Sequence, residues 1–293
     1  MDKNKDLIVT ETFNLAVKNH QNNNLKEAQD LYNQILKVDP KYIDAYNNLG
    51  LLFESTGKDQ KAMDCYKKAI EINPNYVNAH TNLGNVFKTL GEKQKAIDCY
   101  EKAIKIKPNY DMPHNNLGVI FQDLNQHKKA MDCYEKAIEI NPNYSKSHNN
   151  LGVIFQNLGY YQKGVNCYKK AIEIDPNFID AHYNLGGAFK KLDEYQKSID
   201  CYKKAIKINP NYADAHYNLG LILRELGKYQ KAMDCYKNAI EINPNYVDAY
   251  NNLGGILLDL EEYQKAKNCF EKALEIDPNN LVATINFPNI YIY

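Results

Sequence analysis

Seven cysteines are the residues of this 293-residue chain with the widest chemistry, since a thiol can act as a nucleophile, a disulfide partner or a metal ligand. All are spaced 34 residues apart, at Cys65, Cys99, Cys133, Cys167, Cys201, Cys235 and Cys269. In stacked units, equivalent positions would lie about 10 Å apart, because packed helices are roughly 8–10 Å apart. A disulfide requires Cα atoms within about 7 Å, and zinc requires ligands that converge on one point. The spacing therefore predicts half-buried packing residues and no metal site.

Histidine, the usual general base, follows the same spacing. Five of the seven histidines lie 34 residues apart, at His80, His114, His148, His182 and His216. The same argument predicts that they pack against a neighbouring unit, and we expect His20 and His127 to be surface residues. The sequence has no Gly-rich phosphate loop and no Cys-x-x-Cys or His-Glu-x-x-His motif. Catalysis needs one constellation of unlike residues, whereas this chain repeats like residues, so we expect no catalytic residues, no cofactor and no enzyme activity.

The elements that position these residues follow from one period. Leu-Gly begins at residues 49, 83, 117, 151, 185, 219 and 253, and eight of the ten prolines are also 34 residues apart. Setting Leu-Gly at unit positions 7 and 8 predicts an N-terminal extension at 1–8, eight units over 9–280 and a truncated ninth unit at 281–293. The eight units are 9–42, 43–76, 77–110, 111–144, 145–178, 179–212, 213–246 and 247–280.

Each unit has the pattern of two helices. Positions 4, 7, 8 and 11 are patterned in the first half and positions 20, 24, 27 and 28 in the second, which is the spacing of one helix face. Position 15 is Gly, Asn or Asp in most units, residues that tolerate a left-handed backbone, although Glu261 breaks this rule. The Asn/Asp-Pro pairs, such as Asn73-Pro74, should end the second helix and start the next unit.

The 34-residue pattern Leu-Gly…Ala…Tyr…Ala…Pro resembles that of tetratricopeptide-repeat (TPR) proteins over residues 9–280. The resemblance implies an all-α fold, a right-handed superhelical solenoid of helix-turn-helix repeats whose first helices line a concave groove. TPR modules that clamp a C-terminal carboxylate use Lys and Arg at positions 2, 5 and 6. Here position 6 is never basic and position 5 is Asn, Thr or Tyr in the close copies, so we expect no such clamp.

An asparagine at position 6 is the feature with the clearest binding chemistry. Helical geometry places positions 2, 5, 6, 9, 12 and 13 opposite the buried face, so we expect them to be exposed. Asn carries an acceptor and two donor hydrogens, and therefore binds a peptide bond without reading the side chain. One unit of about 10 Å equals about three residues of extended peptide. The predicted peptide-binding ladder is Asn14, Asn48, Asn82, Asn116, Asn150, Asn184, Asn218 and Asn252.

This ladder is similar to that in the TPR half of O-linked N-acetylglucosamine transferases, and so are local sequence segments such as Asp64-Cys65-Tyr66-Lys67-Lys68. Two interpretations stay open. The chain is a non-catalytic interaction scaffold that binds an extended peptide or partner protein in the groove, or it is the TPR portion of a glycosyltransferase-like protein without the catalytic domain.

The amino-acid composition limits the classes of binding partner that we expect. There are 36 Lys+Arg and 36 Asp+Glu, so the basic excess typical of nucleic-acid or membrane-surface binding is absent from the sequence. The chain shows no signal-peptide pattern and no apolar run of membrane-spanning length, which predicts a soluble protein of the cytoplasm or nucleus. Pro288 should end the ninth first helix, and Ile and Tyr residues follow it. We therefore expect either that the chain is a fragment or truncated product of a longer array, or that it self-associates through this end.

Overall fold

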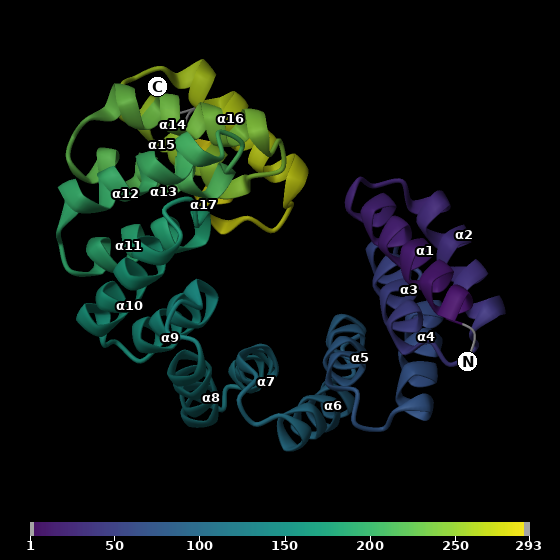
Figure 1. Ribbon diagram of the computed structural model, residues 1–293. Helices are drawn as coiled ribbons and strands as arrows, with labels where there is room; N and C mark the ends of the chain where they lie inside the picture. The colour runs from purple at the N-terminus through teal and green to yellow at the C-terminus, as the bar shows by residue number, and fades with distance from the viewer. Residues whose placement is uncertain (1–2, 290–293) are drawn as a thin grey trace. The chain divides into compact units, whose positions relative to one another are not determined.

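A computed structural model describes residues 3–289, and α-helix is the only regular secondary structure in that range (Figure 1). The chain divides into two compact units, Met1–Ser147 and His148–Tyr293, and the boundary falls inside α9. The predicted all-α fold, built from consecutive helix pairs, is confirmed.

The helices of the first unit alternate between a first and a second helix of each pair. Their bounds are α1 Lys3–Gln21, α2 Leu25–Val38, α3 Ile43–Ser55, α4 Asp59–Ile72, α5 Val77–Thr89, α6 Lys93–Ile106, α7 Asp111–Asp123 and α8 His127–Ile140.

The second unit continues this alternation. It contains most of α9 Ser145–Asn157, followed by α10 Tyr161–Ile174, α11 Ile179–Lys191, α12 Tyr195–Ile208, α13 Ala213–Glu225, α14 Tyr229–Ile242, α15 Val247–Asp259, α16 Tyr263–Ile276 and α17 Leu281–Asn289.

Two local signals set the helix ends. Between the two helices of each pair, position 15 has a positive φ, and this includes Glu261 at 62° as well as Gly57 at 67°. The backbone thus demands the left-handed conformation even where the residue type opposes it. At the end of a second helix, the Asn73 N–H still bonds to the Ala69 carbonyl, and the Asn73 side chain then accepts the Asn75 N–H within the turn.

In the seven pairs from α3–α4 to α15–α16, the core joins a glycine on the first helix to an aromatic ring on the second, whereas α1 has Ala16 in that position. Tyr66, Tyr100 and their counterparts are fully buried, as are the alanines one helical turn away. A Cβ added to Gly50 would lie 2.5 Å from the Tyr66 ring, and one added to Gly84 would lie 2.6 Å from the Tyr100 ring. Glycine at position 8 is therefore required by close approach of the ring, not by backbone conformation.

The structure adds detail at both ends of the helical region. α1 begins at Lys3, so the described part of the predicted extension 1–8 is helical and continues directly into the first helix of the repeat 9–42. The expectation that Pro288 ends its helix is wrong, since α17 reaches Asn289. The proline φ is itself helical, so the backbone can continue through it with the loss of one hydrogen bond. Residues 290–293, on which the predicted self-association partly depends, lie outside the described residues.

Candidate functional site

The predicted ladder asparagines all lie on first helices, one on each from α1 to α15. Asn14 is exposed and the other seven are half-buried. Five of them, Asn82, Asn116, Asn184, Asn218 and Asn252, each donate a hydrogen bond to the preceding first helix.

In the first unit, the ladder amides bond to polar side chains of the preceding first helix. The Asn82 amide donates to Oδ1 of Asn47 at 2.9 Å, and the Asn116 amide donates to Oδ1 of Asn85 at 2.8 Å. Asn116 in turn accepts a hydrogen bond of 3.2 Å from its neighbour Asn115. The asparagines therefore tie adjacent first helices together while facing the same surface.

The second unit has the same connection with two kinds of acceptor. The Asn184 amide donates to Oδ1 of Asn149 at 3.0 Å. Further along, tyrosines replace the acceptor: Asn218 donates to the Tyr183 hydroxyl at 3.0 Å, and Asn252 donates to the Tyr217 hydroxyl at 3.2 Å.

These bonds determine how much hydrogen-bonding capacity each asparagine keeps for a ligand. Asn82 and Asn184 each spend one amide hydrogen on the preceding helix, which leaves a second hydrogen and the Oδ1 acceptor. The Asn218 amide also donates to the Asp214 carbonyl at 2.9 Å, and only its Oδ1 remains. Asn252 spends its amide in the same way, and its Oδ1 accepts from Arg224 at 2.8 Å. Capacity for a peptide bond therefore differs along the ladder.

The expectation that position 5 is exposed is wrong. Asn47 and Asn149 are 6% exposed, and Thr81 is fully buried. A helical wheel considers one helix alone, whereas here the next first helix covers position 5 and supplies the position-6 amide that bonds to it. The sequence carried a usable signal, since position 5 is polar in every close copy and lies 35 residues before the next ladder asparagine.

Buried tyrosines hold further polar side chains on the first helices. The Tyr66 hydroxyl donates to the Glu54 carboxylate at 2.9 Å, and the Tyr134 hydroxyl donates to the Gln122 side chain at 2.9 Å. Burial raises the pKa of Glu54, while the Tyr66 hydrogen bond opposes that rise. The tyrosine thus joins the helix-pair core to position 12 of the same pair.

The thiols do not converge. All seven cysteines are free and half-buried. Burial raises the pKa of Cys65 and Cys201 to about 12, and the pKa of Cys99, Cys133 and Cys235 to about 11. Within residues 3–289, no group of three or more His, Cys, Asp or Glu could hold a metal ion.

The regularly spaced histidines stabilise the turns between pairs. Nε2 of His80 lies 2.9 Å from the Pro74 carbonyl, and Nε2 of His182 lies 3.0 Å from the Pro176 carbonyl. Because a carbonyl only accepts, Nε2 carries the proton. His20 is half-buried instead of lying on the surface, with its ring 6.3 Å from that of Tyr32, and burial lowers its pKa. His127 is half-buried as well.

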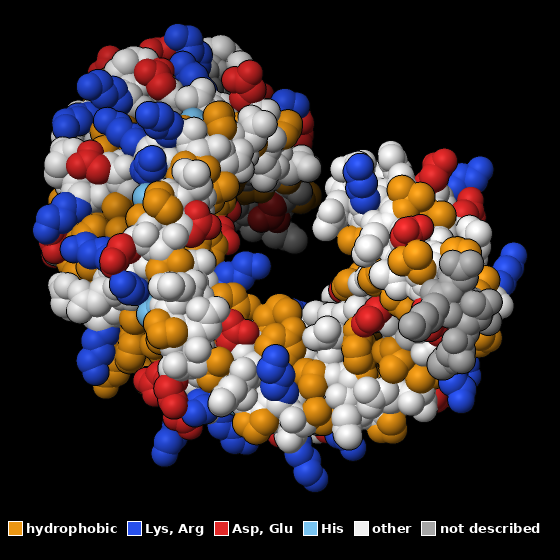
Figure 2. All heavy atoms as spheres, viewed as in Figure 1, with side chains coloured by type: hydrophobic (Ala, Val, Ile, Leu, Met, Phe, Trp, Pro, Cys, Tyr) orange, Lys and Arg blue, Asp and Glu red, His pale blue; other side chains and the backbone are white. Residues whose placement is uncertain are grey.

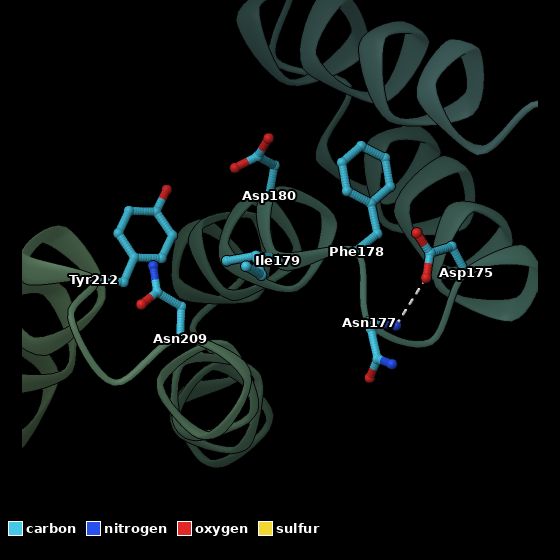
Figure 3. Close-up of a pocket in the computed structure, with 7 residues that line it drawn as sticks. All are labelled: Asp175, Asn177, Phe178, Ile179, Asp180, Asn209 and Tyr212. Carbon is cyan, nitrogen blue, oxygen red and sulfur yellow. Dashed lines mark hydrogen bonds between the residues drawn. The ribbon is translucent and has the colours of Figure 1, made fainter. Parts of the chain in front are cut away.

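Two hollows lie in the second unit. One lies at the turns between helix pairs, where Asp175 accepts the Asn177 N–H at 3.0 Å, while Asn209 and Tyr212 come from the next turn (Figure 3). The other, of about 530 Å³, is on the ladder surface. We call it the ladder hollow, and its lining residues are Gln156, Tyr183, Asn184, Gly187, Lys190, Lys191, Asp193, Tyr195, Tyr202, Asn218 and Glu225.

Charged side chains of both signs are interspersed on the face shown in Figure 2, over both units. Among the described residues, no helix is both long enough and apolar enough to span a membrane.

The helix pairs, the glycine–aromatic contacts and the 34-residue period define an all-α repeat protein. A family model described as tetratricopeptide repeat matches residues 77–110, 113–144, 213–246 and 247–280, and a second with the same description matches 133–165. A model described as TPR repeat matches 55–91, 157–193 and 188–223. The chain belongs to the tetratricopeptide-repeat family.

Solved structures agree with this assignment. MamA is 30% identical with a TM-score of 0.52, over 55% of this chain and 95% of its own. YrrB, described as a TPR protein with an unusual peptide-binding site, is 23% identical with a TM-score of 0.54, over 65% of this chain and 98% of its own. A chain of the APC/C hetero-tetramer Cut9-Hcn1 is 16% identical with a TM-score of 0.68, and 91% of this chain spans 52% of that one. No curated protein matches the sequence.

Proposed function

We propose that the chain is a non-catalytic protein-interaction scaffold that binds an extended peptide, or an extended segment of a partner protein, along its first helices. The observation that carries the proposal is that Asn82 and Asn184 each use only one amide hydrogen between helices. The second amide hydrogen and the Oδ1 acceptor of each side chain are therefore left for a ligand. A peptide group needs one donor and one acceptor, and each of these asparagines retains both. The peptide-binding site of YrrB supports the same use of this fold.

The proposal keeps the full ladder from Asn14 to Asn252, with different contributions along it. Asn82 and Asn184 would hold the peptide backbone with both donor and acceptor, whereas Asn252 has a mainly structural role because Arg224 and Tyr217 occupy its amide group. The assignment of eight repeat units over 9–280, with a ninth begun at 281, belongs to this proposal.

The test separates ligand binding from the bonds between helices. A library of unstructured, end-blocked 12-residue peptides is selected on the intact chain, and the affinity of selected peptides is then measured calorimetrically. The variants Asn82→Ala and Asn184→Ala, made one at a time, each lose one peptide contact of about 1 kcal/mol, so we expect each to bind its selected peptides roughly fivefold more weakly. The matched controls are Asn47→Ala and Asn149→Ala, each of which removes the same helix-to-helix bond but keeps the ladder amide.

We expect each control to bind within about twofold of the wild type. Equal weakening in a ladder variant and its control would show that the asparagine acts only by holding the helices together. Failure of any peptide to be selected would refute peptide binding outright.

The alternative is that this array is the TPR portion of a glycosyltransferase-like protein, without its catalytic domain. The position-6 asparagines favour it, since they recur in every unit. A reading frame continuous with this one and encoding a nucleotide-sugar domain would establish it, and a stop codon followed by unrelated sequence would exclude it.

The remaining partner predictions also belong to this proposal. The equal numbers of basic and acidic residues support a protein partner over nucleic acid or a membrane. A location in the cytoplasm or nucleus is proposed together with it. On α17, Leu281 is 69% exposed and Val282 is 49% exposed, which supports self-association through this helix. Light scattering that finds a monomer at high concentration would refute it.

A further inference from the structure

Gly187 of α11 lines the ladder hollow, at a repeat position where most of the other first helices have a side chain. A Cβ added at Gly187 would lie 3.7 Å from the Tyr202 hydroxyl and 3.8 Å from Nε2 of Gln156, both ordinary contact distances. The equivalent residue is Val153 on the preceding first helix and Leu221 on the following one. The missing side chain therefore leaves an open volume on the ladder surface, flanked by polar atoms.

The lining presents hydrogen-bond donors on one part of its wall. Gln156 uses Oε1 to accept from the Tyr168 hydroxyl at 3.2 Å, so its amide hydrogens are available beside Gly187. Tyr183 accepts the Asn218 amide at 3.0 Å and keeps its own O–H for donation. Both groups would bond to a ligand oxygen.

The lining also presents acceptors. Asn184 has spent an amide hydrogen on Asn149, and its Oδ1 remains on the ladder surface. Asn218 has spent both amide hydrogens, so its Oδ1 is its remaining polar atom. These two oxygens need a ligand that carries N–H or O–H.

The charges of the lining cancel. Lys190 pairs with Glu225 at 3.0 Å, and Asp193 accepts from the Tyr195 hydroxyl at 3.2 Å. With Lys191, the lining holds two basic and two acidic residues. A carboxylate has no hydrogen for the asparagine oxygens, and an ammonium group has no acceptor for the Gln156 amide. A neutral carboxamide has both.

We propose that the ladder hollow is a side-chain subsite for an Asn or Gln residue of the bound peptide. The inference rests on the proposed function, because the ladder would hold the backbone while the hollow takes one side chain. It adds sequence selectivity to a surface that otherwise holds only peptide groups.

The test uses four pools of end-blocked 12-residue peptides with random Gly, Ser, Ala and Thr and one fixed central residue: Gln, Glu, Lys or Leu. Binding of each pool to the intact chain is measured by fluorescence anisotropy. We expect the Gln pool to bind about tenfold more tightly than each of the others, since each of the other side chains leaves donors or acceptors of the lining unpaired.

Two variants localise the effect. Gly187→Val introduces the residue of the preceding helix and should reduce the Gln pool to the level of the others. Gly255→Val, at the equivalent place on α15, is the matched control, because Arg224 already lies 3.8 Å from that position and the change leaves the ladder hollow open. Circular dichroism checks that both variants fold, and Gly187→Ala gives a milder version of the same change.

The other possible outcomes of the pool experiment would each contradict the proposal. Tightest binding of the Glu or Leu pool would replace the carboxamide subsite by an anion or apolar one. Equal binding of all four pools, with no effect of Gly187→Val, would overturn the subsite and leave the ladder proposal intact. Binding of no pool to the wild-type chain would overturn both.

Discussion

Two adjacent glycines on α11 allow the glycine–aromatic contact to be tested against an internal control. A Cβ at Gly186 would lie 2.9 Å from the Tyr202 ring, whereas a Cβ at Gly187 would meet its nearest atom at 3.7 Å. We therefore compare Gly186→Ala with Gly187→Ala, which make the same chemical change one residue apart in one helix.

The magnitude follows from two opposed effects. Alanine is favoured over glycine within a helix by roughly 0.5–1 kcal/mol, and both variants gain this. Only at Gly186 must the ring move by about 0.6–1 Å to reach an ordinary carbon–carbon separation. Tyr202 is 2% exposed, so its neighbours must move too, at an overpacking cost of about 1–3 kcal/mol. The helix-propensity gain cancels in the comparison, so Gly186→Ala should be less stable than Gly187→Ala by about 1–3 kcal/mol.

The assay is urea unfolding of the full chain followed by circular dichroism. Repeat arrays do not always unfold in one step, but both substitutions lie in the same helix and affect the same step. Gly187→Ala should raise the urea midpoint and Gly186→Ala should lie below it. Equal midpoints would mean that the tyrosine ring accommodates a methyl group freely, and that close packing does not explain glycine at position 8.

Three other predictions concern local features. Glu261→Gly should stabilise the chain by about 1 kcal/mol, because Glu261 holds a φ of 62°, and an unchanged urea midpoint would argue against strain there. Burial raises the pKa of the Cys99 thiol to about 11 in the folded state, whereas the ordinary pKa of 9.0 applies to the unfolded chain. Because the folded state keeps this proton where the unfolded state has lost it, the contribution of Cys99 to the free energy of unfolding should be constant below about pH 8 and fall between about pH 9 and 11. Iodoacetamide should modify the folded chain slowly at pH 8, and rapid modification would contradict this. Lys190→Ala should cost less than about 1 kcal/mol, because the Lys190 and Glu225 side chains are 26% and 44% exposed, and added salt should remove the difference from wild type.

Much of the local structure was predictable from the sequence because each signal acts within one repeat. The spacing of Leu49, Gly50 and Phe53 predicts a helix face, and the Asn-Pro pair at 73–74 predicts the end of the next helix. The even spacing of cysteine and histidine also predicts that neither type converges on one point. These inferences require only the period and the geometry of a single helix.

The tertiary structure decided what the side chains of neighbouring repeats do to one another. The burial of Asn47, the choice of Asn149 or Tyr183 as the acceptor of a ladder amide, and the hollow above Gly187 all depend on contacts between first helices about one repeat apart. A helical wheel treats each helix as if one face were solvated, and therefore predicted a uniform, exposed ladder. Packing of the next first helix onto that face consumes amide hydrogens at some positions and leaves them at others. For this physical reason the sequence alone determines that the asparagines recur, while the fold determines which of them keep amide hydrogens and acceptors that are not used between helices.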